Sequence, residues 1–191
     1  MKRAIIVHGW DGFPEECWFP WLKRELESRG FAVTVPQMPD AAHPHIETWV
    51  PALADVVGTP DEELYLIGHS MGVQTIMRYL ASIDVTIGWF VAVAGFFSLI
   101  LDETEDESVA QPWLTTQIAT EKVKANARAI SAIFSDDDRF VPLENIDFFK
   151  SKLGAEVVLL HGRGHMGGSD DATVVPQILE AVLSVADMPK K

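Results

Sequence analysis

The residues that could carry chemistry in this sequence are a serine, an aspartate and a histidine, each placed just after a predicted β-strand. Ser70 lies in a Gly-x-Ser-x-Gly motif, Asp138 follows the apolar run 129–134, and His165 follows the run 156–160. A serine hydroxyl is a weak nucleophile until a histidine takes its proton, and a carboxylate on the other ring nitrogen orients that histidine. Together the three residues predict acyl transfer through a Ser-His-Asp triad.

The serine motif has the local context that this chemistry requires. The apolar residues 64–67 run straight into the motif, and a helical pattern begins at Met71. Glycines two residues before and after Ser70 let a strand and a helix approach at a tight turn, where the serine takes a strained backbone conformation. This predicts a nucleophile elbow that holds the Ser70 hydroxyl at the carboxyl end of the sheet. The alternative is a strand-to-helix turn that carries a serine by chance.

Neighbouring residues offer alternatives for the acid and the base. Asp136 and Asp137 precede Asp138, and we interpret them as turn or capping residues because Asp138 directly opens the turn toward Val-Pro. His161 competes with His165 as the base, but it lies nearer the strand and is interpreted as structural. Consecutive carboxylates do not converge easily on one cation, so we expect neither a metal nor a cofactor.

Acyl transfer also needs hydrogen-bond donors for the negative charge that develops on the carbonyl oxygen. We assign these to the backbone N–H groups of Met71, which follows the nucleophile, and of Trp10, which follows the first strand and Gly9. His69, inside the elbow, is expected to support the turn rather than to react. The aromatic residues that could line an apolar acyl pocket, with core packing as the alternative for each, are Trp10, Phe96, Phe97 and Trp113.

The elements that must position these residues alternate between short apolar runs and helical patterns. The predicted strands are 4–7, 31–35, 64–68, 87–93, 129–134 and 156–160. The predicted helices are 14–29, 46–58, 71–82, 120–127, 143–153 and 173–186. This alternation predicts a single α/β domain over residues 1–191, a Rossmann-like three-layer sandwich with about six parallel strands and helices on both faces. Residues 95–117 are predicted to form an irregular loop or small cap, and their acidic run 102–107 a solvated loop.

Composition limits the class of protein. The chain has 191 residues, of which 48% are hydrophobic and 23% charged, as is ordinary for a soluble globular domain. A net charge of −13 argues against a nucleic-acid-binding surface. Cys17 is the one cysteine, so no intramolecular disulfide can form, and it lies among aromatic residues that suggest packing. No apolar run reaches the length of a signal or membrane segment, so we expect a cytoplasmic protein without membrane contact.

These motifs together resemble the α/β-hydrolase superfamily and, more closely, the small serine hydrolases of the retinoblastoma-binding protein 9 and YdeN-like family. The residues that carry the resemblance are 8–12, 68–72, 95–97, 135–142 and 162–165. The resemblance implies a compact hydrolase with a minimal cap, and it supports Ser70, Asp138 and His165 as the triad, in the chain order of that superfamily. The resemblance does not imply retinoblastoma protein as a partner of this chain. That link rests on a Leu-x-Cys-x-Glu motif, and Cys17 does not lie in one.

We therefore predict a carboxylesterase-like serine hydrolase that cleaves small carboxylic esters, with thioesters and amides as further candidates. His165 is expected to act as general base and then general acid on an acyl-enzyme at Ser70, with Asp138 orienting it. Two alternatives are a protein-interaction module that keeps the hydrolase fold with little turnover, and an acyltransferase that uses the same triad. The expected ligand is a small-molecule ester or amide, and the protein partner is left open.

Overall fold

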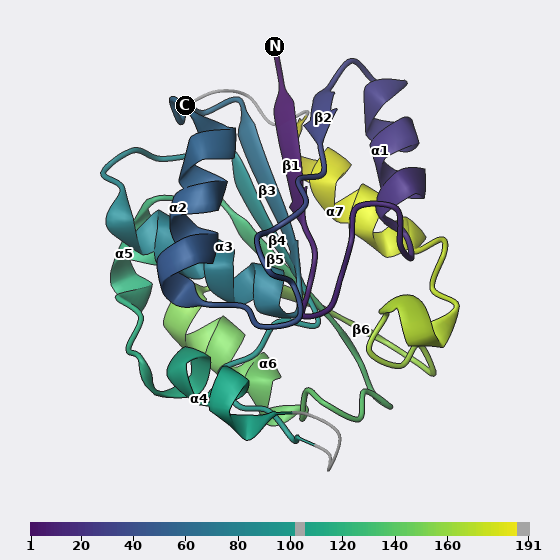
Figure 1. Ribbon diagram of the computed structural model, residues 1–191. Coiled ribbons are helices and arrows are strands. Elements are labelled where there is room, and N and C mark those ends of the chain that lie inside the picture. The colour runs from purple at the N-terminus through teal and green to yellow at the C-terminus, as the bar shows by residue number, and fades with distance from the viewer. Residues whose placement is uncertain (102–105, 187–191) are drawn as a thin grey trace.

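The apolar runs of the sequence form the parallel strands of one sheet in the computed structural model, which describes residues 1–101 and 106–186 (Figure 1). The sheet has six strands in the order β2-β1-β3-β4-β5-β6. They are β1 (Arg3–Val7), β2 (Ala32–Thr34), β3 (Leu64–His69), β4 (Trp89–Val93), β5 (Ile130–Ser135) and β6 (Glu156–Leu160). The predicted fold, a single α/β domain built on a parallel sheet, is confirmed.

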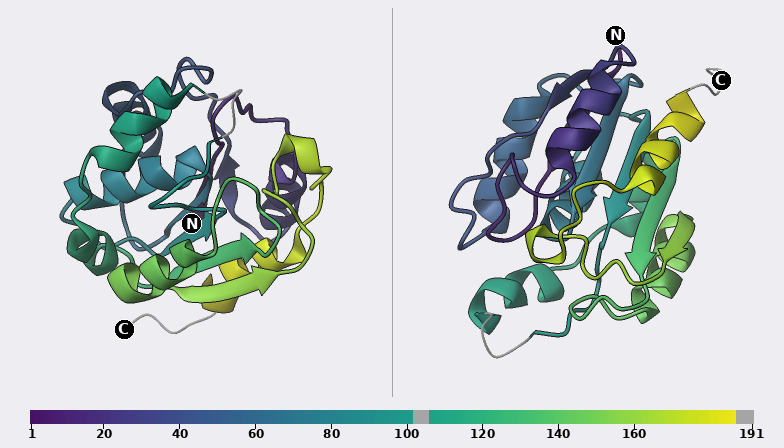
Figure 2. Two further views of the ribbon diagram at one scale, coloured as in Figure 1. Left: turned by 90° about the horizontal axis from the view of Figure 1, so that it is seen from below. Right: turned by 90° about the vertical axis from the view of Figure 1, so that its right-hand side faces the viewer.

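Helices cover both faces of this sheet (Figure 2). One face packs against α1 (Phe19–Glu27) and α7 (Pro176–Ala186). The opposite face packs against α2 (Ile46–Val57), α3 (Met71–Ser82), α5 (Thr120–Ala125) and α6 (Glu144–Phe148). Helix α4 (Glu107–Thr115) lies near the carboxyl ends of the strands (Figure 1). None of the helices in the described part of the chain is long and apolar enough to cross a membrane.

Side-chain alternation along the strands divides the core into two layers. In β1, Ala4 and Ile6 pack on the side of α1 and α7, whereas Ile5 and Val7 pack against the helices of the other face. Successive side chains of a strand point to opposite faces, so a strand that is covered on both sides must be apolar throughout. This is the physical reason for the uninterrupted apolar runs of β1, β3, β4 and β5, whereas Val158 and Leu159 of the edge strand β6 are exposed.

Many predicted boundaries shift by one to three residues in the structure, and three segments differ in a larger way. The helix predicted over 14–29 begins at Phe19, because Cys17 has a φ of 40° and residues 14–18 form turns instead. The helix predicted over 143–153 is α-helical only to Phe148 and continues as a π-helical turn. The segment predicted as a loop or small cap contains α4, and its residues 102–105, which hold most of the acidic run, lie outside the described residues.

Helix α4 is tied to the body of the domain by polar contacts. Asp106 caps its N-terminus by accepting a hydrogen bond from the backbone N–H of Ser108 at 2.9 Å. At the other end, the indole N–H of Trp113 donates to the carbonyl oxygen of Pro44 at 2.9 Å. The guanidinium of Arg78, on α3, donates to the carbonyl oxygen of Trp113 at 3.0 Å. These contacts hold α4 beside the strand ends.

The turn between β3 and α3 depends on two glycines. A Cβ on Gly68 would lie 2.7 Å from the backbone nitrogen of Val73, within the helix that follows. A Cβ on Gly72 would overlap the carbonyl oxygen of Val7 in the neighbouring strand β1. Side chains at these positions would separate the helix from the sheet. The glycine spacing therefore sets how closely α3 packs against β1 and β3.

We expect Gly72→Ala to lower the free energy of unfolding by about 3 kcal/mol, because backbone atoms of β1 cannot rotate away from the new methyl group. Urea denaturation would measure this change. Gly167→Ala is the matched control, since its Cβ would come no closer than 3.5 Å to the nearest atoms. We expect the control to change stability by no more than about 0.5 kcal/mol. Equal stability of the two variants would contradict the packing argument.

Candidate active site

The carboxyl ends of the strands meet at a cavity of about 750 Å³. After β1 the chain moves toward one edge of the sheet to form β2, whereas after β3 it moves toward the other edge to form β4. Ligands bind at such a switch point in open parallel sheets, because the outgoing loops diverge and leave a crevice. The residues that line the cavity from successive strand ends are Gly9 and Trp10 after β1, Ser70 and Met71 after β3, Phe96 after β4, Phe140 after β5 and His165 after β6.

Ser70 occupies the sharp turn into α3 and lies against the loop that follows β1. Its φ of 50° and ψ of −113° are strained for a residue with a side chain. A Cβ on Gly9 would lie 3.2 Å from the Cβ of Ser70, so the two backbones approach closely. The indole N–H of Trp10 donates to the carbonyl oxygen of Ala42 at 2.8 Å and anchors this loop. Trp10 and Met71, the predicted oxyanion donors, thus both border the cavity beside Ser70.

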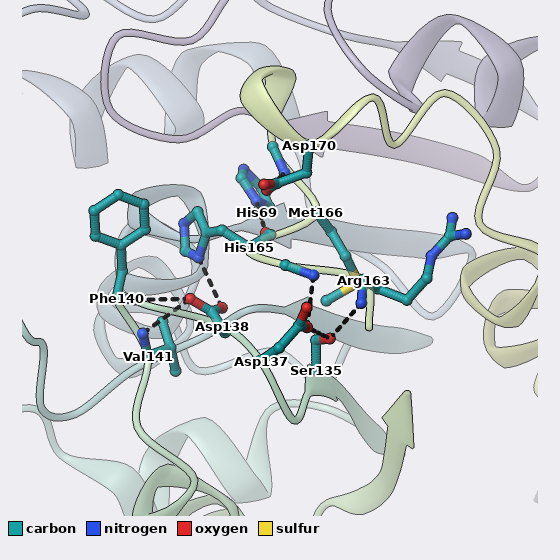
Figure 3. A network of polar contacts seen from close by, with 12 residues as sticks. His69, Ser135, Asp137, Asp138, Phe140, Val141, Arg163, His165, Met166 and Asp170 are labelled. Carbon is teal, nitrogen blue, oxygen red and sulfur yellow. Dashed lines mark hydrogen bonds and ion pairs between the residues drawn. The ribbon is translucent and has the colours of Figure 1, made fainter. Parts of the chain in front are cut away.

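Asp138 and His165 form a partly buried hydrogen-bonded pair (Figure 3). The Nδ1 atom of His165 lies 2.8 Å from Oδ2 of Asp138, and the two side chains are 13% and 2% exposed. The other carboxylate oxygen accepts hydrogen bonds from the backbone N–H groups of Phe140 at 2.9 Å and Val141 at 3.0 Å. A carboxylate only accepts, so Nδ1 of His165 carries the proton and Nε2 is the basic nitrogen.

The consecutive aspartates bind successive parts of the loop after β6. Oδ2 of Asp136 lies 2.6 Å from Nδ1 of His161, a hydrogen bond that lowers the pKa of Asp136. Asp137 accepts a hydrogen bond from the backbone N–H of Gly164 at 2.8 Å (Figure 3). Asp138, the third of these aspartates, is paired with His165. Their carboxylates diverge to separate partners, and among the described residues no group of three or more His, Cys, Asp or Glu side chains is arranged to hold a metal.

The aromatic residues predicted for the acyl pocket separate into two places. Trp10 and Phe96 line the cavity that contains Ser70. Phe97 and Trp113 instead line a second cavity of about 530 Å³. Phe97 packs against the ring of Phe149 at 5.3 Å between centroids, and Trp113 is buried against the body of the domain. Only the first two aromatic residues are thus in contact with the space around Ser70.

Sequence reasoning missed several loop residues that form walls of the first cavity. The sequence predicts a helix that includes residues 14–17, and it predicts an irregular loop with no stated contact for the apolar residues 99–101. The available signal for residues 99–101 is their apolar character within the segment that follows the predicted strand 87–93. The additional lining residues are Asp11, Phe13, Glu16, Cys17, Leu99, Ile100, Leu101, Arg139, Gly167, Gly168 and Ser169.

His69, the residue before Ser70, is buried between aromatic rings and the loop that bears His165. Its Nε2 atom lies 2.9 Å from the carbonyl oxygen of His165 (Figure 3). Burial, reinforced by the nearby charge of His165, lowers the pKa of His69 to about 3. The imidazole of His69 is therefore neutral in the folded protein near neutral pH.

Cys17 lines the same cavity, and its thiol is expected to be unreactive. Burial, with a further contribution from the charge of Glu16, raises the pKa of Cys17 to about 12 from 9.0. The thiolate is the reactive form, so iodoacetamide should alkylate Cys17 in the folded protein about 10³-fold more slowly than in the unfolded chain. Mass spectrometry of native and urea-unfolded samples would measure both rates. Rapid alkylation of the native protein would show that the thiol is activated rather than buried.

The neutral state of His69 should make the protein sensitive to acid. Its folded-state pKa lies below the unfolded value of 6.5, so its contribution to stability is present above that value and is lost as the pH falls toward about 3. From about pH 7.5 to about pH 5, His69 should therefore account for about 2 kcal/mol of lost stability.

Urea denaturation of the wild type and His69→Gln at both pH values tests this, because glutamine does not titrate. His8, whose pKa is also lowered by burial, is common to both proteins and cancels in the comparison. The same loss of stability in both proteins would rule out His69 as the source.

Proteins described as hydrolases resemble this chain over nearly its whole length. A family model described as serine hydrolase matches residues 4–184. YdeN of Bacillus subtilis (strain 168), named as a hydrolase, is 26% identical over 190 residues, which cover 96% of this chain and 95% of YdeN. The serine hydrolase RBBP9 of Rattus norvegicus is 28% identical over 189 residues, which cover 96% of this chain and 97% of RBBP9.

Solved structures share the fold. The ydeN gene product of B. subtilis matches with a TM-score of 0.89 and 25% identity over 98% of this chain and 100% of that one. Est1E of Butyrivibrio proteoclasticus, solved with bound ferulic acid, matches with a TM-score of 0.77 over 98% of this chain and 90% of Est1E. At its 17% identity, Est1E shows the fold alone. With the family model matched from residue 4 to residue 184, the chain belongs to the serine hydrolase family.

Proposed function

We propose that this protein hydrolyses small carboxylic esters through an acyl-enzyme on Ser70. The observation that carries the proposal is that Ser70 and His165 line one cavity, where His165 is held by the buried carboxylate of Asp138. The match to the serine hydrolase family supports an acyl substrate. Thioesters and amides undergo the same acyl transfer and are further candidates.

In the first half of the reaction, Nε2 of His165 takes the proton of Ser70 as its oxygen attacks the substrate carbonyl carbon. Asp138 keeps Nδ1 protonated and stabilises the imidazolium that forms. The backbone N–H groups of Trp10 and Met71 stabilise the negative charge on the carbonyl oxygen. The leaving alcohol takes the proton from His165, and the acyl group stays on Ser70.

In the second half, a water molecule attacks the acyl-enzyme while His165 takes its proton. The proton returns to Ser70 as the carboxylic acid leaves, so the enzyme is regenerated. No group beyond this chain and water is needed to balance the reaction.

The dimensions and walls of the cavity favour a small acyl group. A volume of about 750 Å³ is in the range of small-molecule sites. Apolar side chains such as Phe96 and Leu99 line it, and they suit an alkyl or aryl chain. Glu16 adds a carboxyl group whose pKa is raised by burial. The acyl group that we propose is thus apolar where it contacts Phe96 and Leu99.

Hydrolysis of p-nitrophenyl esters, from acetate to long acyl chains, tests the proposal. We expect Ser70→Ala to lower kcat/KM by at least about 10³-fold and Asp138→Asn by about 10³- to 10⁴-fold, because the triad acts as a unit. A fluorophosphonate probe should label the wild type but not Ser70→Ala. Ser28→Ala is the matched control, since this exposed serine lies outside the cavity, and its activity and labelling should be unchanged.

Two results would contradict the proposal. One is a folded wild type that escapes the fluorophosphonate probe and cleaves no ester, thioester or amide. The other is transfer of the acyl group to an added alcohol in preference to water, which would identify an acyltransferase.

A further inference from the structure

The histidine that precedes Ser70 is hydrogen-bonded to the main chain of His165. The imidazole of His69 is 4% exposed, and its Nε2 lies 2.9 Å from the carbonyl oxygen of His165, which is 96 residues away in the chain (Figure 3). A carbonyl oxygen only accepts hydrogen bonds, so Nε2 of His69 carries the proton and is the donor of this hydrogen bond. This bond joins the turn that bears Ser70 to the loop that follows β6.

The same ring also packs against the loop that follows β1. A Cβ on Gly9 would lie 3.1 Å from Nδ1 of His69, and a Cβ on Gly167 would lie 3.5 Å from its Cε1. Both positions are glycine, so the backbones lie directly on the ring. His69 therefore contacts the loop beside Ser70 as well as the loop of His165.

The surroundings of His69 fix its orientation and its tautomer. The rings of Trp18 and Phe19 lie at 6.3 Å and 6.1 Å between centroids, and the ring of His165 lies at 4.9 Å. Nδ1 is buried without a hydrogen-bond partner among the described residues, so a proton on it would have no acceptor. The packing around His69 therefore favours the neutral form with the proton on Nε2. In this form the Nε2–H group donates to the carbonyl oxygen of His165.

From these contacts we infer that His69 is a positioning residue that fixes the main chain at His165 relative to Ser70. Asp138 orients the imidazole of His165 through Nδ1, whereas His69 holds the backbone that carries this imidazole. Placement of a base within a fraction of an ångström matters, since a shift of about 1 Å can cost about 10²-fold in rate. The inference rests on the proposed role of His165 as the base.

Variants that keep or remove the donor test the inference. In His69→Gln, the side-chain amide can donate to the carbonyl oxygen from the position of Nε2, whereas leucine in His69→Leu has similar bulk and no donor. With the best p-nitrophenyl ester, we expect His69→Leu to lower kcat by about 10- to 10²-fold while KM changes little, because the misplaced base affects chemistry rather than binding. His69→Gln should recover most of the lost kcat.

Two further variants keep the test decisive. His69→Asn provides a donor too short to reach the position of Nε2, so it should resemble His69→Leu, and it replaces that variant if leucine prevents folding. His43→Leu is the control, since His43 is an exposed histidine that pairs with Asp40 outside the cavity, and it should leave kcat unchanged. Thermal unfolding of each variant identifies a temperature at which all are folded.

The inference is overturned if His69→Leu and His69→Asn, both folded, keep the kcat of the wild type. It is also overturned if His69→Gln loses as much activity as His69→Asn, because the hydrogen bond would then not be the cause. In both cases the wild type is active and labelled at Ser70, so the proposed function stands. An inactive, unlabelled wild type would overturn the proposed function and this inference with it.

Discussion

The close contact between the start of helix α3 and the end of strand β1 is the constraint on which the site depends. Gly72 lies so near the carbonyl oxygen of Val7 that no side chain fits between them. Helix α3 is buried along residues 71–80, so it cannot tilt away from the sheet without opening a void in the core. The turn from β3 must therefore be tight, and Ser70 takes its positive φ as a consequence.

Polar contacts between loops fix the loop conformations, which apolar packing of the sheet and helices does not determine. Strands β5 and β6 are parallel neighbours, with Ser135 beside Leu160, so the loops after them begin side by side. Asp137 and Asp138 then bind the second loop, and His69 binds it from the opposite side. Buried polar groups cost free energy when they are left unpaired, so these contacts select one loop conformation among many. Cavity shape around Ser70 follows from that selection.

Much of the fold could be predicted from the sequence, because it depends on patterns within short segments. Uninterrupted apolar runs indicate strands, and each such run became a strand of the sheet, although only the inner strands β1, β3, β4 and β5 are buried along nearly their whole length. The glycines around Ser70 indicate a tight strand-to-helix turn, and that turn is present. Asp138 and His165 were placed after strands by the same reasoning, and parallel strands bring their carboxyl ends to one edge. Their catalytic roles stay predictions.

Which side chains meet depends on how the elements pack together. Phe96 and Phe97 are adjacent aromatic residues, yet they line different cavities, and nothing in their local sequence distinguishes them. The residues around Cys17 fit a helical pattern, but there the chain turns to form a wall of the cavity. The bond of His69 reaches across 96 residues. The strands, the elbow and the order of the elements follow from the sequence alone, because backbone preference and apolar pattern act locally. Contacts between distant side chains exist only once the sheet and its helices have packed.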